Sequence, residues 1–163
     1  MTSELYAKLT LRSLTALKMA SKCSFTLCKL RFLDHFCLVM KHNSSFAVAS
    51  SELVIVEASA GDPEAAARRL DALQGIAELP IDEEIQKFAD QLMSKGGIPA
   101  VAKADALHIA ITAVHGIDYL LTWNLRHIDN PVKKPRIRSI CADAGYSCPE
   151  ICTPAELLQR TEF

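Results

Sequence analysis

From residue 46 onward, short apolar stretches alternate with segments that carry helix caps and helix-ending signals. The first stretch, residues 46–56, is rich in β-branched and aliphatic side chains, as a strand buried in a parallel sheet would be. Further strands are predicted at residues 76–79, 118–122 and 150–152. Strands that alternate with helices in this way indicate an α/β domain whose mostly parallel sheet is covered on both faces.

The helices are predicted from the residues at their ends. Asp62 is expected to cap a helix that has Pro63 at its first position and ends at about residue 73. Asp82 and Glu83 lie in the first turn of a helix that reaches about residue 94. Further helices are expected from residue 99 or 100 to residue 114, at residues 136–144, and from Pro154 onward. Residues 57–61 and 131–135 are expected to be a turn and a loop.

The N-terminal part of the chain, residues 1–42, differs in composition from the rest. It holds seven basic residues and two acidic ones, although the whole chain has 18 Lys plus Arg against 19 Asp plus Glu. The formal net charge of −1 excludes a protein that grips nucleic acid through bulk positive charge, but it does not exclude a local basic patch. Helices are expected at residues 9–19 and 32–40. This basic, Ser- and Thr-rich stretch has features of an organellar targeting segment, but lysines interrupt it, and we expect a cytoplasmic protein.

Cysteine spacing and hydropathy narrow the class of protein further. The six cysteines lack the paired spacing of a zinc site and are expected to be reduced thiols. No uncharged apolar run approaches the roughly 18–20 residues that a membrane span requires. We therefore expect no membrane-spanning segment.

Polar residues follow two of the predicted strands at the point where each strand ends. Glu57 comes after the strand at residues 46–56, and Asn124 comes after the strand at residues 118–122. The carboxyl ends of parallel strands meet at one edge of a sheet, where ligands bind. Asp105 lies near the start of the long helix, and helix N-termini face that same edge. Carboxylate and carbonyl oxygens suit Mg²⁺ or Mn²⁺, and two such ions can activate water and stabilise the leaving oxygen of a phosphodiester.

Each of these residues also has an ordinary structural explanation. Asp105 could complement the helix dipole, Glu57 could cap a nearby amide, and Asn124 could be a turn residue. His108 lies three residues after Asp105 on the same helical face. It could be a semi-buried histidine whose hydrogen bonds are satisfied within the fold, or it could be a partner of the site residues. A basic cluster could contact a phosphate backbone or could simply be solvated charge; it consists of Lys133, Lys134, Arg136 and Arg138.

Two runs of residues after residue 46 resemble segments of PIN-domain proteins, above all of the VapC-type toxins of bacterial toxin–antitoxin systems. The first is Ala-Asp-Ala-Leu-His-Ile-Ala at residues 104–110, and the second is Asp-Tyr-Leu-Leu-Thr-Trp-Asn at residues 118–124. The family's second motif is similar to residues 51–61, in which Glu57 lies four residues before Gly61. Residues 151–157 look like the end of one subgroup. The resemblance covers about residues 46–158.

The resemblance implies a single PIN-like domain over residues 1–163, with a three-layer α/β/α fold and a mostly parallel central sheet. It implies a metal-dependent endoribonuclease, which hydrolyses phosphodiester bonds in RNA with Mg²⁺ or Mn²⁺. By motif match, Glu57 and Asp105 would be metal ligands, and Asn124 would join them as a catalytic residue where many members have an aspartate. An antitoxin protein would be the partner, and the chain would form a homodimer.

One departure from the family pattern concerns its first acid, an aspartate at the end of an opening strand. Residues 1–33 contain no aspartate, and only sixteen residues separate Asp34 from Ser51. The segment at residues 1–42 therefore matches the family poorly, as a divergent or frameshifted N-terminus would. Because hard cations need several carboxylates to stay bound, we predict weak metal affinity and impaired hydrolysis.

Two other functions remain open from the sequence. One is a degenerate PIN domain that binds RNA or a protein partner without cleaving it. The other is a generic α/β small-molecule binder, which ranks last because the chain has no glycine-rich phosphate loop.

Overall fold

The computed structural model describes residues 23–28 and 46–160, and all structural statements below refer to these residues. The strands are β1 (Cys23–Cys28), β2 (Phe46–Ser51), β3 (Ala77–Leu79), β4 (Tyr119–Thr122) and β5 (Glu150–Cys152). The helices are α3 (Glu52–Ser59), α4 (Pro63–Ala72), α5 (Glu83–Ser94), the 3-10 turn η1 (Ala100–Ala102), α6 (Lys103–Val114), α7 (Lys134–Asp143) and α8 (Pro154–Arg160).

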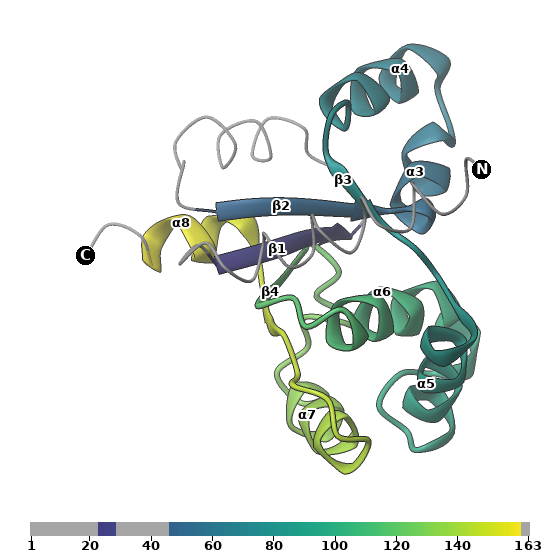
Figure 1. Cartoon of the computed structure of the whole chain (residues 1–163), viewed down its shortest axis with the longest axis vertical. Coiled ribbons are helices and arrows are strands. Elements are labelled where there is room, and N and C mark those ends of the chain that lie inside the picture. The colour runs from purple at the N-terminus through teal and green to yellow at the C-terminus, as the bar shows by residue number, and fades with distance from the viewer. Residues whose placement is uncertain (1–22, 29–45, 161–163) are drawn as a thin grey trace, which may run out of the picture.

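The described strands form one parallel sheet in the order β3-β2-β1-β4-β5 (Figure 1). The α/β class and the parallel pairing predicted from the sequence are confirmed. The central strand was not predicted: β1 comes from the basic segment at residues 1–42, and it pairs with β2 on one side and β4 on the other. Its last residue, Cys28, lies opposite Thr122, the last residue of β4.

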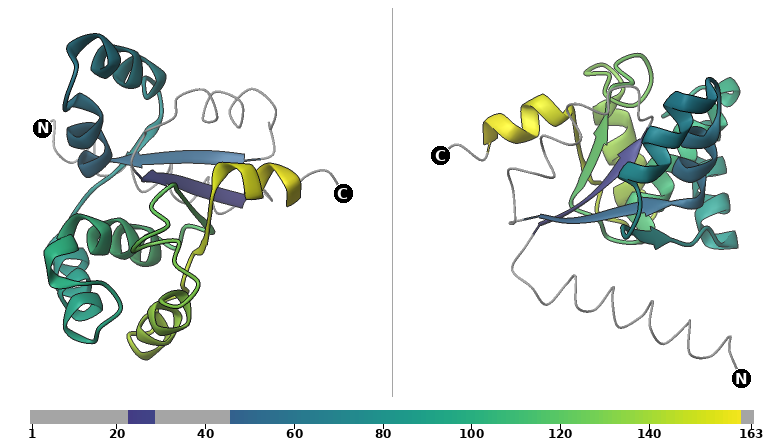
Figure 2. Two further views of the ribbon diagram at one scale, coloured as in Figure 1. Left: turned by 180° about the vertical axis from the view of Figure 1, so that it is seen from behind. Right: turned by 90° about the horizontal axis from the view of Figure 1, so that it is seen from above.

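Hydrophobic clusters pack against both faces of this sheet. Neighbouring residues of a strand point to opposite faces, and β4 accordingly places Leu120 in one cluster and Leu121 in the other. Helices α5, α6 and α7 supply the first cluster, whereas α3, α8 and the end of α4 supply the second. The two further views show these groups of helices on either side of the strands (Figure 2). Burial on both faces explains why the apolar residues Leu120 and Leu121 are adjacent in β4.

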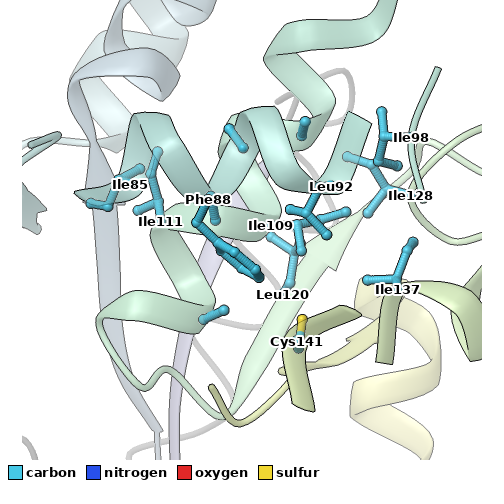
Figure 3. Packing of buried hydrophobic residues seen from close by; sticks show 14 of the residues in the cluster. Ile85, Phe88, Leu92, Ile98, Ile109, Ile111, Leu120, Ile128, Ile137 and Cys141 are labelled. Atoms are coloured by element: carbon cyan, nitrogen blue, oxygen red, sulfur yellow. The ribbon is translucent and has the colours of Figure 1, made fainter. Parts of the chain in front are cut away.

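The larger cluster is centred on the contact between α5 and α6. Ile85, Phe88 and Leu92 are spaced at three and four residues on α5, so they form one apolar stripe that faces α6 (Figure 3). Helix α6 is buried over most of its length, because it lies between α5 and the sheet. This packing fixes the position of α6, and α6 carries two residues of the candidate site.

One predicted strand was too long. The structure ends β2 at Ser51 and begins α3 at Glu52, so Glu57 lies inside a helix and not in a turn that follows a strand. The side chain of Ser51 accepts a hydrogen bond from the backbone N–H of Val54, as an N-cap does. The burial of Val54 and Ala58, four residues apart, places one side of α3 against the sheet.

The other boundaries agree with the sequence to within a few residues. Asp62 and Asp82 are N-caps, and their carboxylates accept from Ala65 N–H at 2.8 Å and Ile85 N–H at 2.9 Å. The long helix is divided into η1 and α6, and α7 begins at Lys134, two residues earlier than predicted. The helices expected at residues 9–19 and 32–40, and Asp34, lie outside the described residues. None of the described helices has the length and apolar character needed to cross a membrane.

Candidate functional site

The candidate site is built on the first two turns of α6. Asp105 lies in the first turn of this helix and His108 one turn later, and each is only 2% exposed. Helix α6 leads into β4, so its N-terminus faces the edge at which the parallel strands end. The position of Asp105 is the one that the sequence predicted, and a carboxylate in a first turn also complements the helix dipole.

Glu57 reaches this helix from α3. Its Oε2 lies 3.1 Å from Nε2 of His108, and its side chain is 23% exposed. Helix α3 is held against α4 by Arg69, whose guanidinium donates to the carbonyl oxygens of Ala58 at 2.9 Å and Ala60 at 2.5 Å. These contacts fix the C-terminal half of α3, which is the part that carries Glu57.

Asn124 organises the loop that follows β4. Its backbone N–H donates to the Thr122 hydroxyl at 2.9 Å, and its side-chain oxygen accepts from His127 N–H at 3.1 Å. Its carbonyl oxygen accepts from the N–H groups of Ile128 and Asp129. Ile128 is fully buried and anchors the loop in the larger hydrophobic cluster. Asn124 therefore lies where the sequence predicted, and the contacts of its side-chain oxygen are those of a turn residue.

This loop brings His127 to Asp105. Nδ1 of His127 lies 2.8 Å from Oδ2 of the aspartate, and the histidine side chain is 19% exposed. This contact of His127 was not predicted from the sequence. The local signal for it is that His127 lies three residues after Asn124, a spacing at which an Asn side chain accepts from a backbone N–H as an N-cap does.

The site thus consists of two carboxylate–histidine pairs on one face of α6. Residues three apart on a helix are neighbours, with Cβ atoms about 5–6 Å apart, so the Asp105–His127 and Glu57–His108 pairs lie side by side. In each pair one partner is deeply buried, Asp105 or His108, and the other is partly exposed. Carboxylate oxygens are donors of the type that hard cations prefer, and the two histidines fix the orientation of both carboxylates.

The donor atoms fit a hard divalent cation in chemical type, but they are few. Glu57 and Asp105 supply carboxylate oxygens, and each carboxylate already uses one oxygen to accept from a histidine. Within the part of the chain that the structure describes, no group of three or more His, Cys, Asp or Glu side chains is placed to hold a metal ion. Strand β1, which ends beside Thr122, contains no acidic residue. Two formal negative charges favour a weakly held ion.

Three members of the predicted RNA-binding cluster make contacts within the protein. Lys134 forms an ion pair with Asp129 and donates to the carbonyl oxygen of Ile151 at 2.8 Å. Arg136 donates to the carbonyl oxygen of Lys95, and Arg138 donates to Glu150. These bonds give the cluster a structural role, and contact of Lys133, Lys134, Arg136 and Arg138 with RNA stays a prediction.

Comparisons with known proteins gave no family assignment for this chain. A scan against protein-family models found no match to the chain, and a search of curated proteins found no significant match.

Proposed function

We propose that this chain is a PIN-like protein of the VapC toxin type and that it acts as a metal-dependent endoribonuclease of low activity. The observation that carries the proposal is the convergence of Glu57 and Asp105, which lie far apart in the sequence, on one face of α6. The hydrophobic clusters on both faces of the parallel sheet support the three-layer α/β/α fold that the resemblance implies.

In this proposal Glu57 and Asp105 would hold Mg²⁺ or Mn²⁺ at the carboxyl edge of the sheet. The ion would supply Lewis acidity for the hydrolysis of an RNA phosphodiester. His108 and His127 keep the two carboxylates in fixed orientations, as partners behind metal ligands commonly do. Asn124 would position water from the loop that it organises, and its side chain contributes no charge. The low activity follows from the two-carboxylate donor set.

The remaining expectations belong to the same proposal. RNA would be the substrate, with phosphate contacts from Lys133, Lys134, Arg136 and Arg138. The chain would act in the cytoplasm as a homodimer, restrained by an antitoxin protein.

The test is cleavage of an end-labelled RNA in millimolar Mn²⁺ by the chain, by Asp105→Asn and by a matched control, Asp90→Asn. Asp90 is an exposed aspartate on α5, so its substitution changes net charge equally without touching the site. We expect slow cleavage by the chain and by Asp90→Asn, loss of cleavage in EDTA, and a rate at least about tenfold lower for Asp105→Asn. Equal rates for the two variants, or cleavage that persists in EDTA, would refute the proposal.

A second candidate function is binding of RNA without cleavage, by a degenerate PIN domain. It is favoured by the histidine contact of each carboxylate and by the absence of an acidic residue from β1. Retention of the labelled RNA on a filter, with no cleavage at any Mn²⁺ concentration, would select this function over the first.

A further inference from the structure

Two cysteines lie close to each other near the C-terminal end of α7. Cys141 lies in α7 and is fully buried, whereas Cys148 lies in the segment before β5 and is partly exposed. Cys148 packs against the hydrophobic cluster to which Cys141 belongs, and the two thiols are near enough for each to shift the pKa of the other. Neither residue belongs to the proposed ribonuclease site.

The backbone at the end of α7 explains why these residues meet. Tyr146 N–H donates to the carbonyl oxygen of Cys141 at 2.9 Å, and Gly145 N–H donates to that of Ala142 at 3.0 Å. This pair of bonds is a Schellman motif, and it requires the left-handed conformation that Gly145 adopts at φ +84°. The chain therefore turns back on the helix immediately after α7, and Cys148 returns to the side of Cys141.

Cys148 is accessible from a surface pocket of about 280 Å³. The pocket is also lined by Asp118, Tyr119, Ser147 and Glu150. Asp118 precedes β4 and Glu150 begins β5, so the pocket lies at the amino-terminal edge of these strands. The candidate ribonuclease site lies at the opposite, carboxyl-terminal edge. A small reagent can thus reach Cys148 without entering that site.

The surroundings of the two sulfurs give them different chemical character. The adjacent thiol of Cys141 lowers the pKa of Cys148, and the nearby guanidinium of Arg138 adds to this effect, against the opposing influence of burial and Glu150. The adjacent Cys148, together with burial, raises the pKa of Cys141, so this residue stays a thiol. Because the thiolate is the nucleophile in cysteine chemistry, Cys148 is the more reactive member of the pair.

We propose that Cys148 is a peroxide-reactive site and that Cys141 resolves the oxidised sulfur as an intramolecular disulfide. In the first step the Cys148 thiolate attacks one peroxide oxygen and the O–O bond breaks. Cys148 becomes a sulfenic acid, and the departing hydroxide takes up a proton to form water. In the second step the sulfur of Cys141 attacks the sulfur of Cys148. The S–S bond forms, the S–O bond breaks, and the hydroxyl leaves as water with the Cys141 proton. Two thiols are oxidised by two electrons, and one hydrogen peroxide is reduced to two waters.

Peptide mapping of the intact chain after treatment with hydrogen peroxide tests this proposal. Cleavage after acidic residues separates the three cysteines near the C-terminus, because Asp143 and Glu150 lie between them. We expect peptide 130–143, which holds Cys141, to be joined to peptide 144–150, which holds Cys148. The joined species should have the mass of both peptides less two hydrogens, and thiol reductants should separate it.

Three variants make the assignment specific. Cys148→Ser should abolish the cross-linked species, and Cys141→Ser should leave a sulfenic acid at Cys148 that dimedone labels. Cys152→Ser is the matched control, because Cys152 is a buried thiol in β5, and it should cross-link as the unaltered chain does. Absence of the cross-linked species from the unaltered chain, or oxidation of Cys152 ahead of Cys148, would overturn the proposal.

Discussion

Each carboxylate of the candidate site is paired with a histidine, and in each pair the buried partner forms a hydrogen bond with the partly exposed one. Asp105 is 2% exposed and accepts from His127, so the histidine compensates part of the loss of hydration that burial imposes on the carboxylate. His108 is equally buried and contacts Glu57. The same contacts that stabilise the fold thus also set the orientation of the proposed metal ligands.

Removal of His127 should therefore destabilise the protein. We expect His127→Ala to lower the free energy of unfolding by about 1–3 kcal/mol, because a buried carboxylate loses one hydrogen-bond donor. His115→Ala is the matched control, since His115 also makes one ring-nitrogen contact, 2.9 Å from the carbonyl oxygen of Pro80, but at an exposed position. Urea unfolding of the three proteins measures the difference. A loss for His127→Ala no larger than that for His115→Ala would contradict this role.

The neighbouring lysines Lys133 and Lys134 are expected to differ in their contribution to stability. Lys134 pairs with Asp129, which is 7% exposed, so Lys134→Met leaves a buried carboxylate without its ion-pair partner. We expect a loss of about 3 kcal/mol in the free energy of unfolding. Lys133→Met should change the stability by no more than about 0.5 kcal/mol. If thermal and urea unfolding show the two variants to be equally stable, the ion pair has no structural role.

At the scale of helices and strands, local sequence signals predicted the helix starts better than they predicted which segments form strands. Asp62 and Asp82 marked helix starts correctly because an N-cap acts on its own helix. Residues 53–56, Leu-Val-Ile-Val, are typical of a strand, yet the Ser51 cap and packing against the sheet make them helical. In β1 the apolar residues Cys23, Phe25 and Leu27 alternate with Ser24 and Thr26. This pattern is a strand signal that the surrounding mixed sequence obscured.

The end of β1 offers a direct way to test why the activity should be low. Cys28 lies opposite Thr122, at the carboxyl ends of the strands, and Lys29 is the next residue in the sequence. A carboxylate there would add a third negative charge. We expect one of the two substitutions, Cys28→Asp or Lys29→Asp, to increase the rate of RNA cleavage and to lower the Mn²⁺ concentration required, because a third carboxylate would strengthen binding of the ion.

The control for this gain is the same substitution combined with Asp105→Asn. The increased rate should disappear in the double variant, since both carboxylates would contribute to one ion. A gain that survives loss of Asp105, or no gain with either substitution, would show that the missing acid does not limit activity.

Across the whole molecule, the change in composition near residue 42 does not coincide with a boundary in the fold. The basic segment at residues 1–42 supplies β1, which lies between β2 and β4 in the sheet. Membership of β1 in the sheet could not be predicted from charge, because strand pairing depends on contacts between segments far apart in the chain. Likewise, the sequence indicated Glu57 and Asp105 separately, but only the packing of α3, α6 and the loop after β4 reveals the two histidine pairs.

The most direct measurement is the position of Mn²⁺ in crystals of this protein soaked at high Mn²⁺ concentration, located by anomalous scattering. The account predicts a peak within coordination distance, about 2.0–2.2 Å, of carboxylate oxygens of both Glu57 and Asp105. The peak should be absent from crystals of Asp105→Asn soaked in the same way. Mn²⁺ bound elsewhere, or no peak beside these two carboxylates in the unaltered protein, would contradict the proposal that they form its metal site.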